Sequence, residues 1–108
     1  MRIRKKNLIT FFISMAFVSS AFSQSLSNIK IKTSYYTSNH NTSLYCDATL
    51  QVSQICNKHT NCQVQANNNL CGDPEFGYTK TLITTYSCGS NGYVNKTQEG
   101  EVATLSCS

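Results

Sequence analysis

The stretch NCQVQANNNLCGDPEFGYTKTLITTYSC, from Asn61 to Cys88, carries the strongest fold signals of this chain. Its last eight residues alternate between the two sides of an extended backbone, which is typical of a β-strand with one buried face. An asparagine run at 67–69 and a Gly72-Asp73-Pro74 turn precede that strand, so they predict a long loop. The side chains that share one face of the strand are Leu82, Thr84, Tyr86 and Cys88.

Shorter patterns on either side predict the remaining elements. Residues 29–33, 63–66 and 101–107 alternate in polarity and predict three more strands. Residues 89–100 are rich in glycine and polar side chains, and they predict a loop.

One helix is expected between the first two of these strands. Residues 49–56 place Val52, Ile55 and Cys56 on one helical face, and Asp47 is the predicted N-cap. The expected fold class is therefore a small α/β (α+β) protein. We expect a disulfide-bonded β-sandwich of about five strands with one or two short helices.

The first 23 residues predict a secretory signal peptide. A basic segment at 2–6 is followed by an apolar run at 8–18, and Ala21-Phe22-Ser23 fits a cleavage site. The run is shorter than the roughly 20 apolar residues of a membrane-spanning helix. We expect an exported protein, secreted or periplasmic, with no membrane span after cleavage. Its mature part is a single domain, residues 24–108.

The net charge of the chain changes when the signal peptide is removed. The chain has nine Lys and Arg residues, and four of them lie in the signal peptide. Five lysines then face five carboxylates, so the mature chain carries no net charge, and it contains no arginine. This composition argues against a nucleic-acid partner.

All six cysteines follow the signal peptide, which predicts a disulfide framework in a small exported domain. Six cysteines allow 15 pairings, and their spacing alone selects none of them. A zinc site is the weaker reading, because the chain has no C-x-x-C pair and His40 and His59 lack ligand spacing.

Residues 56–88 resemble the galactose/rhamnose-binding lectin domain (sea-urchin egg lectin-like, SUEL-type), which also occurs in latrophilins. Cys56 and Cys62 match the short cysteine loop of that family. Upstream, Ile29, Ile31 and Tyr36 are similar to the family's strand and loop, but Thr37 and Ser38 replace its Gly-Arg pair. The positions that follow the family's main motif in register are Asn68, Gly72, Asp73, Pro74, Gly77, Lys80, Leu82, Tyr86 and Cys88.

The resemblance also implies a circular permutation. The family's first strand normally lies at the N-terminus, whereas the similar segment QEGEVATLSC occupies residues 98–107 here. A permutation requires only that the original termini lie close together and exposed. A chance match to a short strand pattern is the alternative reading.

The disulfide pairing follows from the same resemblance. It implies Cys88–Cys107 and Cys56–Cys62, and it leaves Cys46 with Cys71. The third bridge is displaced, because Glu75 stands at the family's D-P-C cysteine.

The resemblance further implies a carbohydrate-binding protein that is not an enzyme and needs no metal or cofactor. Its expected partners are cell-surface or secreted glycans. Asp73 and Glu99 would accept hydrogen bonds from sugar hydroxyls, and Lys80 would donate. Gly77 would let the backbone approach the ring, and Tyr36 would pack on its C–H face.

Each of these residues also has a structural reading. Asp73 before Pro74 is often only a turn former, and Lys80 at a strand entrance is often a solvated charge. The missing arginine favours a protein-binding adaptor on the same scaffold, and a toxin- or inhibitor-associated module is a further alternative. Glycosidase chemistry fits poorly, because paired carboxylates normally face each other from separate elements.

Overall fold

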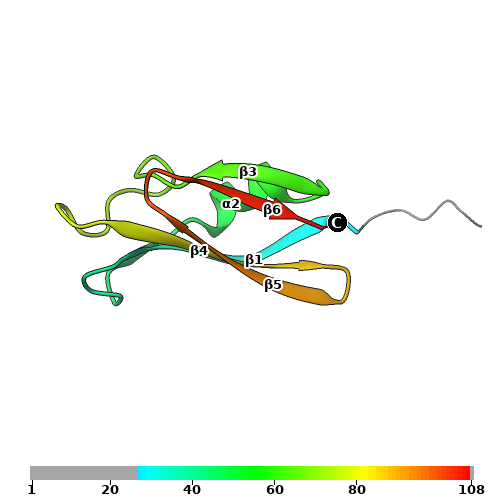
Figure 1. Cartoon of the computed structure of the whole chain (residues 1–108), viewed down its shortest axis with the longest axis horizontal. Coiled ribbons are helices and arrows are strands. Elements are labelled where there is room, and N and C mark those ends of the chain that lie inside the picture. The colour runs from blue at the N-terminus through cyan, green and yellow to red at the C-terminus, as the bar shows by residue number, and fades with distance from the viewer. Residues whose placement is uncertain (1–26, 108) are drawn as a thin grey trace, which may run out of the picture.

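Two β-layers face each other in the computed structural model, which describes residues 27–107 (Figure 1). One layer is an antiparallel sheet with the strand order β2-β1-β4-β5, and the other is the antiparallel pair β3–β6. The single described helix, α2, contacts both β3 and β1. The elements are β1 (Ile29–Ser38), β2 (Tyr45–Asp47), α2 (Thr49–Cys56), β3 (Asn61–Gln65), β4 (Lys80–Cys88), β5 (Asn91–Gln98) and β6 (Val102–Ser106).

This architecture is the predicted small α+β class, with six strands in the described part instead of about five. The helix has the predicted bounds, and the strands predicted at 63–66, 81–88 and 101–107 form within two residues of those positions. The predicted signal peptide and the first residues after it lie outside the described residues.

Strand β1 is twice as long as the strand predicted at residues 29–33. The prediction ended early because a β-bulge changes the phase of the alternation there. Ile29 and Ile31 point into the core, the register shifts between Ile31 and Thr33, and Ser34 and Tyr36 are then buried. The sequence alternation after the bulge places polar side chains inside, so it gives no simple hydrophobic signal.

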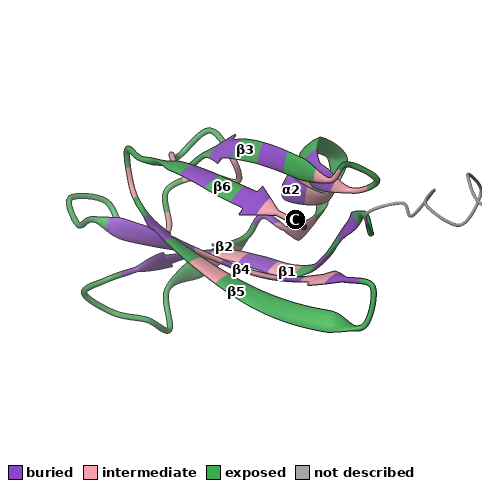
Figure 2. Ribbon diagram, turned by 45° about the vertical axis from the view of Figure 1, so that its right-hand side comes forward, coloured by how far each residue is buried: buried purple, intermediate pink, exposed green. Residues whose placement is uncertain are grey.

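Strand β4 is the centre of the core. Its even-numbered residues are buried, as predicted, and β1 and β5 pair with its two edges. Opposite it, β3 and β6 show a regular alternation of buried and exposed residues (Figure 2). The side chains that meet between the layers include Leu82, Tyr86, Val64 and Leu105, with Val52 from α2.

Strand β5 overturns the predicted loop at 89–100. It pairs with β4 along its whole length, yet nearly all of its residues are exposed (Figure 2). A strand exposed on both faces has no hydrophobic period, so its sequence reads as a loop. A two-residue connection that begins with Gly89, at φ +64°, reverses the chain so that β5 can pair with β4.

The N-cap prediction is wrong by one residue. Ala48 occupies the N-cap position, because Asp47 still belongs to β2. Asp47 nevertheless accepts a hydrogen bond at Oδ1 from the Thr49 amide, 2.9 Å away. Hydrogen bonds from Thr49 hold the pKa of Asp47 below its ordinary value.

The domain contains three disulfide bonds, and they are the pairs that the resemblance implies. Cys88–Cys107 joins the end of β4 to the segment after β6, and Cys56–Cys62 joins α2 to β3. Cys46–Cys71 joins β2 to the long loop before β4. No cysteine of the domain is free.

These bridges indicate an oxidising, extracellular type of environment. Between residues 27 and 107 no helix has the length and apolar character needed to cross a membrane.

Gly89 provides a test of the β4–β5 hairpin. A Cβ at this position would lie 2.8 Å from Ser27 Oγ, and the positive φ disfavours any other residue. We expect Gly89→Ala to lower the free energy of unfolding by about 1 kcal/mol or more. Gly92→Ala is the matched control in the same hairpin, because its Cβ would meet nothing within 4 Å. Equal stability of the two variants in denaturant unfolding would contradict this account of the turn.

Candidate functional site

A shallow, open cavity of about 400 Å³ lies where β4 begins and β5 ends. Four of the five residues predicted to bind sugar line it, and they come from the long loop, β4 and the β5–β6 turn. The full lining is Asn68, Asp73, Phe76, Gly77, Tyr78, Thr79, Lys80 and Glu99.

The period-two geometry of β4 explains why a lysine lies at the base of this cavity. Lys80 has the same parity as Leu82 and Thr84, so its side chain starts on the inner face of the sheet. It lies opposite Ser38, the last residue of β1, where the hydrophobic core ends. Its side chain is only 3% exposed, so its charge needs partners inside the protein.

Two carboxylates supply those partners. Asp73 Oδ1 lies 2.6 Å from Lys80 Nζ, and Glu99 Oε1 lies 3.9 Å from it. The three side chains together carry one negative charge. Asp73 and Glu99 remain 27% and 29% exposed, so both can still accept hydrogen bonds from a ligand.

Glu99 is fixed to Lys80 through the backbone as well. Its Oε1 accepts a hydrogen bond from the Lys80 amide at 3.1 Å, and its own amide donates to the Lys80 carbonyl at 2.9 Å. The segment that the resemblance assigns to a permuted first strand thus contributes a side chain to the cavity next to β4.

Tyr36 does not have its predicted role. Its side chain is completely buried, so its ring cannot pack against the face of a bound sugar. Its hydroxyl instead donates to Asn68 Oδ1 at 3.0 Å. Burial, together with the negative charges of Glu99 and Asp73, raises the pKa of Tyr36 to about 12. Tyr36 therefore supports the cavity from beneath.

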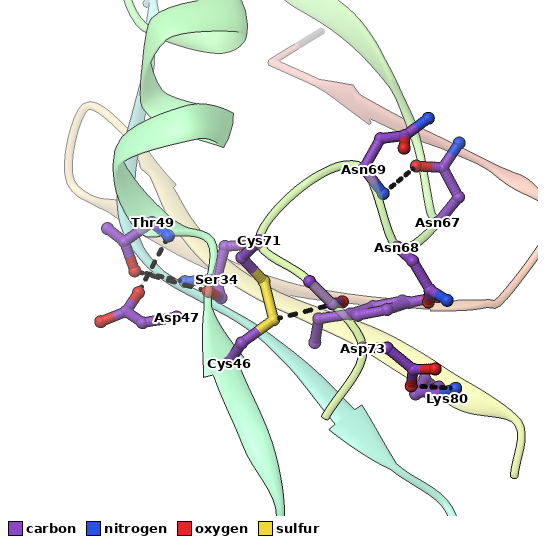
Figure 3. The surroundings of a disulfide bond; sticks show 12 residues. Ser34, Cys46, Asp47, Thr49, Asn67, Asn68, Asn69, Cys71, Asp73 and Lys80 are labelled. Atoms are coloured by element: carbon purple, nitrogen blue, oxygen red, sulfur yellow. Dashed lines mark hydrogen bonds and ion pairs between the residues drawn. A yellow bond between two sulfur atoms is a disulfide. The ribbon is translucent and has the colours of Figure 1, made fainter. Parts of the chain in front are cut away.

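The loop that carries Asn68 and Asp73 is held by the Cys46–Cys71 bridge. Figure 3 shows this bridge beside the asparagine run, with the Asp73 carboxylate directed to the Lys80 ammonium. Asn67 Oδ1 accepts a hydrogen bond from the Asn69 amide at 2.9 Å, which tightens the turn. The run is thus a turn former, and it also presents Asn68 to the cavity.

Gly77 lines the cavity with a left-handed backbone, at φ +88°. A Cβ at this position would meet nothing within 4 Å, so backbone conformation rather than close packing requires the glycine.

Asn39 holds the start of β4 in place through hydrogen bonds. Its amide donates to the Thr79 carbonyl at 2.9 Å, and its Oδ1 accepts from Thr81 Oγ1 at 2.6 Å. Its Nδ2 also donates to Gln98 Oε1 at 3.3 Å, so one side chain links β4 with β5 beside the cavity.

Two aromatic residues at the rim were missed by sequence reasoning. Tyr78 is 45% exposed and Phe76 is 91% exposed, and both line the cavity. The Tyr78 ring is stacked on His40, with 4.0 Å between the ring centroids and 13° between the planes. The Phe-Gly-Tyr sequence in a turn-rich loop is the signal that could have revealed this aromatic rim.

Glu75 attaches the rim to the end of β1. Its Oε1 accepts a hydrogen bond from Ser38 Oγ at 2.5 Å, and its Oε2 lies 3.1 Å from His40 Nδ1. The Ser38 hydroxyl in turn accepts from the His40 amide. Glu75 therefore links the long loop to the end of β1 by hydrogen bonds.

Comparison with family models, curated proteins and solved structures gives no significant match. The resemblance to galactose/rhamnose-binding lectins therefore rests on the motif residues alone.

The buried hydroxyl of Tyr36 predicts a specific pH dependence. Its pKa is raised to about 12 in the folded protein, so the folded state keeps a proton that the unfolded chain releases above the ordinary value of 10.0. The resulting stability is complete below pH 10 and is lost as the pH rises through 12, in total about 2–3 kcal/mol.

Tyr36→Phe isolates this effect. At neutral pH it should cost about 1 kcal/mol through the lost hydrogen bond to Asn68. Because the loss of about 2–3 kcal/mol at high pH exceeds this cost, the advantage of the wild type should shrink above pH 10 and reverse by about pH 12, as measured by denaturant unfolding. Tyr93→Phe, at an exposed tyrosine, should show no such change. Parallel curves for the wild type and Tyr36→Phe would refute the assignment.

The lowered pKa of Glu75 predicts that the rim contributes less stability in acid. The hydrogen bond from Ser38, with help from His40 and Lys80, holds the pKa of Glu75 below its ordinary value of 4.5. The stabilisation is present above pH 4.5 and is lost as the pH falls through the lowered pKa.

Glu75→Gln should reduce stability at neutral pH and flatten this acid dependence. Combining it with Ser38→Ala should give less than the sum of the two separate losses, because Glu75→Gln weakens and Ser38→Ala removes the same hydrogen bond. Additive losses in denaturant unfolding would show that the two residues do not interact.

Proposed function

We propose that this chain is an exported carbohydrate-binding protein without catalytic activity, for neutral glycans of the galactose/rhamnose type. The observation that carries the proposal is the convergence of Asp73, Gly77, Lys80 and Glu99 on one cavity. The sequence motifs predict these four positions, which lie up to 26 residues apart in the chain.

The chemistry of the cavity suits a neutral sugar. Hydroxyl groups both donate and accept hydrogen bonds, and the cavity offers carboxylates, an amide side chain and an ammonium. An ammonium has three donors, and Asp73 at 2.6 Å takes one of them. Because these groups hold each other in place before a ligand arrives, little side-chain freedom is lost on binding.

Glycosidase activity has less support. Glu75, the nearest carboxylate to Asp73 in sequence, is bound to Ser38 and His40 and does not line the cavity. Most glycosidases use two carboxylates that flank the scissile bond. Asp73 and Glu99 instead share a single ammonium on one side of an open depression.

A protein-binding role is the alternative, and one observation favours it. A second cavity of about 400 Å³ lies over the four-stranded sheet, lined by Tyr35, Thr37, Thr42, Tyr45 and Ile83. Tyr35 and Tyr45 meet edge to face there, with ring centroids 5.2 Å apart. Such aromatic surfaces are common in protein interfaces.

The deciding experiment is an NMR titration of the oxidised domain with D-galactose and L-rhamnose. We expect saturable amide shifts that cluster at residues 73–80 and at Glu99. Glu99→Gln should weaken binding about tenfold by removing a charged acceptor. Glu101→Gln is the matched control, since Glu101 is an exposed neighbour that does not line the cavity.

The absence of amide shifts from a folded sample would refute binding of these two sugars to the protein. The protein-binding alternative would then be preferred. Equal weakening by Glu99→Gln and Glu101→Gln would place the binding site elsewhere.

A further inference from the structure

The aromatic rim of the cavity is far more exposed than its charged base. Along one short segment the exposed fraction rises from 2% at Lys80 to 45% at Tyr78 and 91% at Phe76. All three residues line the same cavity. The segment therefore leads from a buried, charged base to an open, aromatic edge.

The Tyr78 ring is held in a fixed position. His40 covers one ring face at a centroid distance of 4.0 Å, and Glu75 binds His40 at 3.1 Å. The Tyr78 amide also donates to the Glu75 carbonyl at 3.3 Å. Tyr78 is 45% exposed and lines the cavity. The part of its surface that His40 does not cover is therefore available to a ligand.

We infer that Tyr78, backed by His40 and accompanied by Phe76, forms a second subsite for the next sugar unit of a glycan. This inference rests on the proposed function and adds the ligand class, a neutral glycan of at least two units. The first unit would bind at Asp73, Lys80 and Glu99. The C–H face of the second unit would pack on Tyr78, which provides the flat apolar surface that the buried Tyr36 cannot.

The charges around the cavity favour a neutral ligand. Asp73, Lys80 and Glu99 together carry one negative charge, and Glu75 lies beneath the rim. A carboxylated or sulfated sugar unit would face these groups without a free cation among the lining residues, because Lys80 is already paired.

The test compares a monosaccharide with a disaccharide that ends in the same sugar. The probes are D-galactose with melibiose and L-rhamnose with rutinose, in which the second unit of both disaccharides is glucose. Dissociation constants are measured by NMR titration for the wild type and for Tyr78→Ala. We expect the wild type to bind at least one disaccharide about tenfold more tightly than its monosaccharide.

Tyr78→Ala should remove this advantage, so that the variant binds the disaccharide and its monosaccharide with affinities that agree within about twofold. Tyr78→Phe should keep it, because the ring rather than the hydroxyl makes the contact. Tyr93→Ala is the matched control, since Tyr93 is 42% exposed and stacks on another ring but belongs to β5 and does not line the cavity. Unfolding free energies of all variants establish that the fold is retained.

The outcomes separate the two hypotheses. Monosaccharide binding that is weakened by Glu99→Gln, with no disaccharide advantage or with an advantage that survives Tyr78→Ala, would overturn the second subsite alone. No binding of any of the four sugars would overturn the proposed function and the second subsite together.

Discussion

The ammonium of Lys80 is the constraint around which this end of the molecule is built. Strand periodicity places the side chain on the inner face of the sheet, where it is almost fully buried. A buried charge is costly unless it is paired, and removing one partner of such a pair is strongly destabilising. Asp73 and Glu99 must therefore lie close to Lys80, although one belongs to the long loop and the other to the turn between β5 and β6.

Holding these carboxylates in place requires the irregular parts of the chain to be ordered. The Cys46–Cys71 bridge ties the long loop to β2, and Glu75 ties the same loop to the end of β1. Tyr36 supports Asn68 from below, and Asn39 joins β4 to the end of β5. The result is a preformed depression of charged and amide groups with an aromatic rim.

The cavity has a charged base and an aromatic rim, and the proposed lectin function uses both. Paired charges at the base fix the direction of hydrogen bonds, whereas the rim supplies an apolar face that is rigid because His40 backs it. A small domain has a limited area for recognition, so the use of both surfaces by one ligand would raise its affinity without enlarging the protein.

The sequence by itself determined the helix at 49–56, the strand of β4 and four of the residues that gather at the cavity, because these signals depend on local periodicity and on a motif of fixed spacing. It could not determine β5, which is exposed on both faces and exists only through pairing with β4. Nor could it separate Tyr36 from Tyr78 as the aromatic residue that faces the cavity. Only the tertiary structure decided that choice, because the bulge in β1 turns Tyr36 into the core while the left-handed turn at Gly77 leaves Tyr78 at the surface.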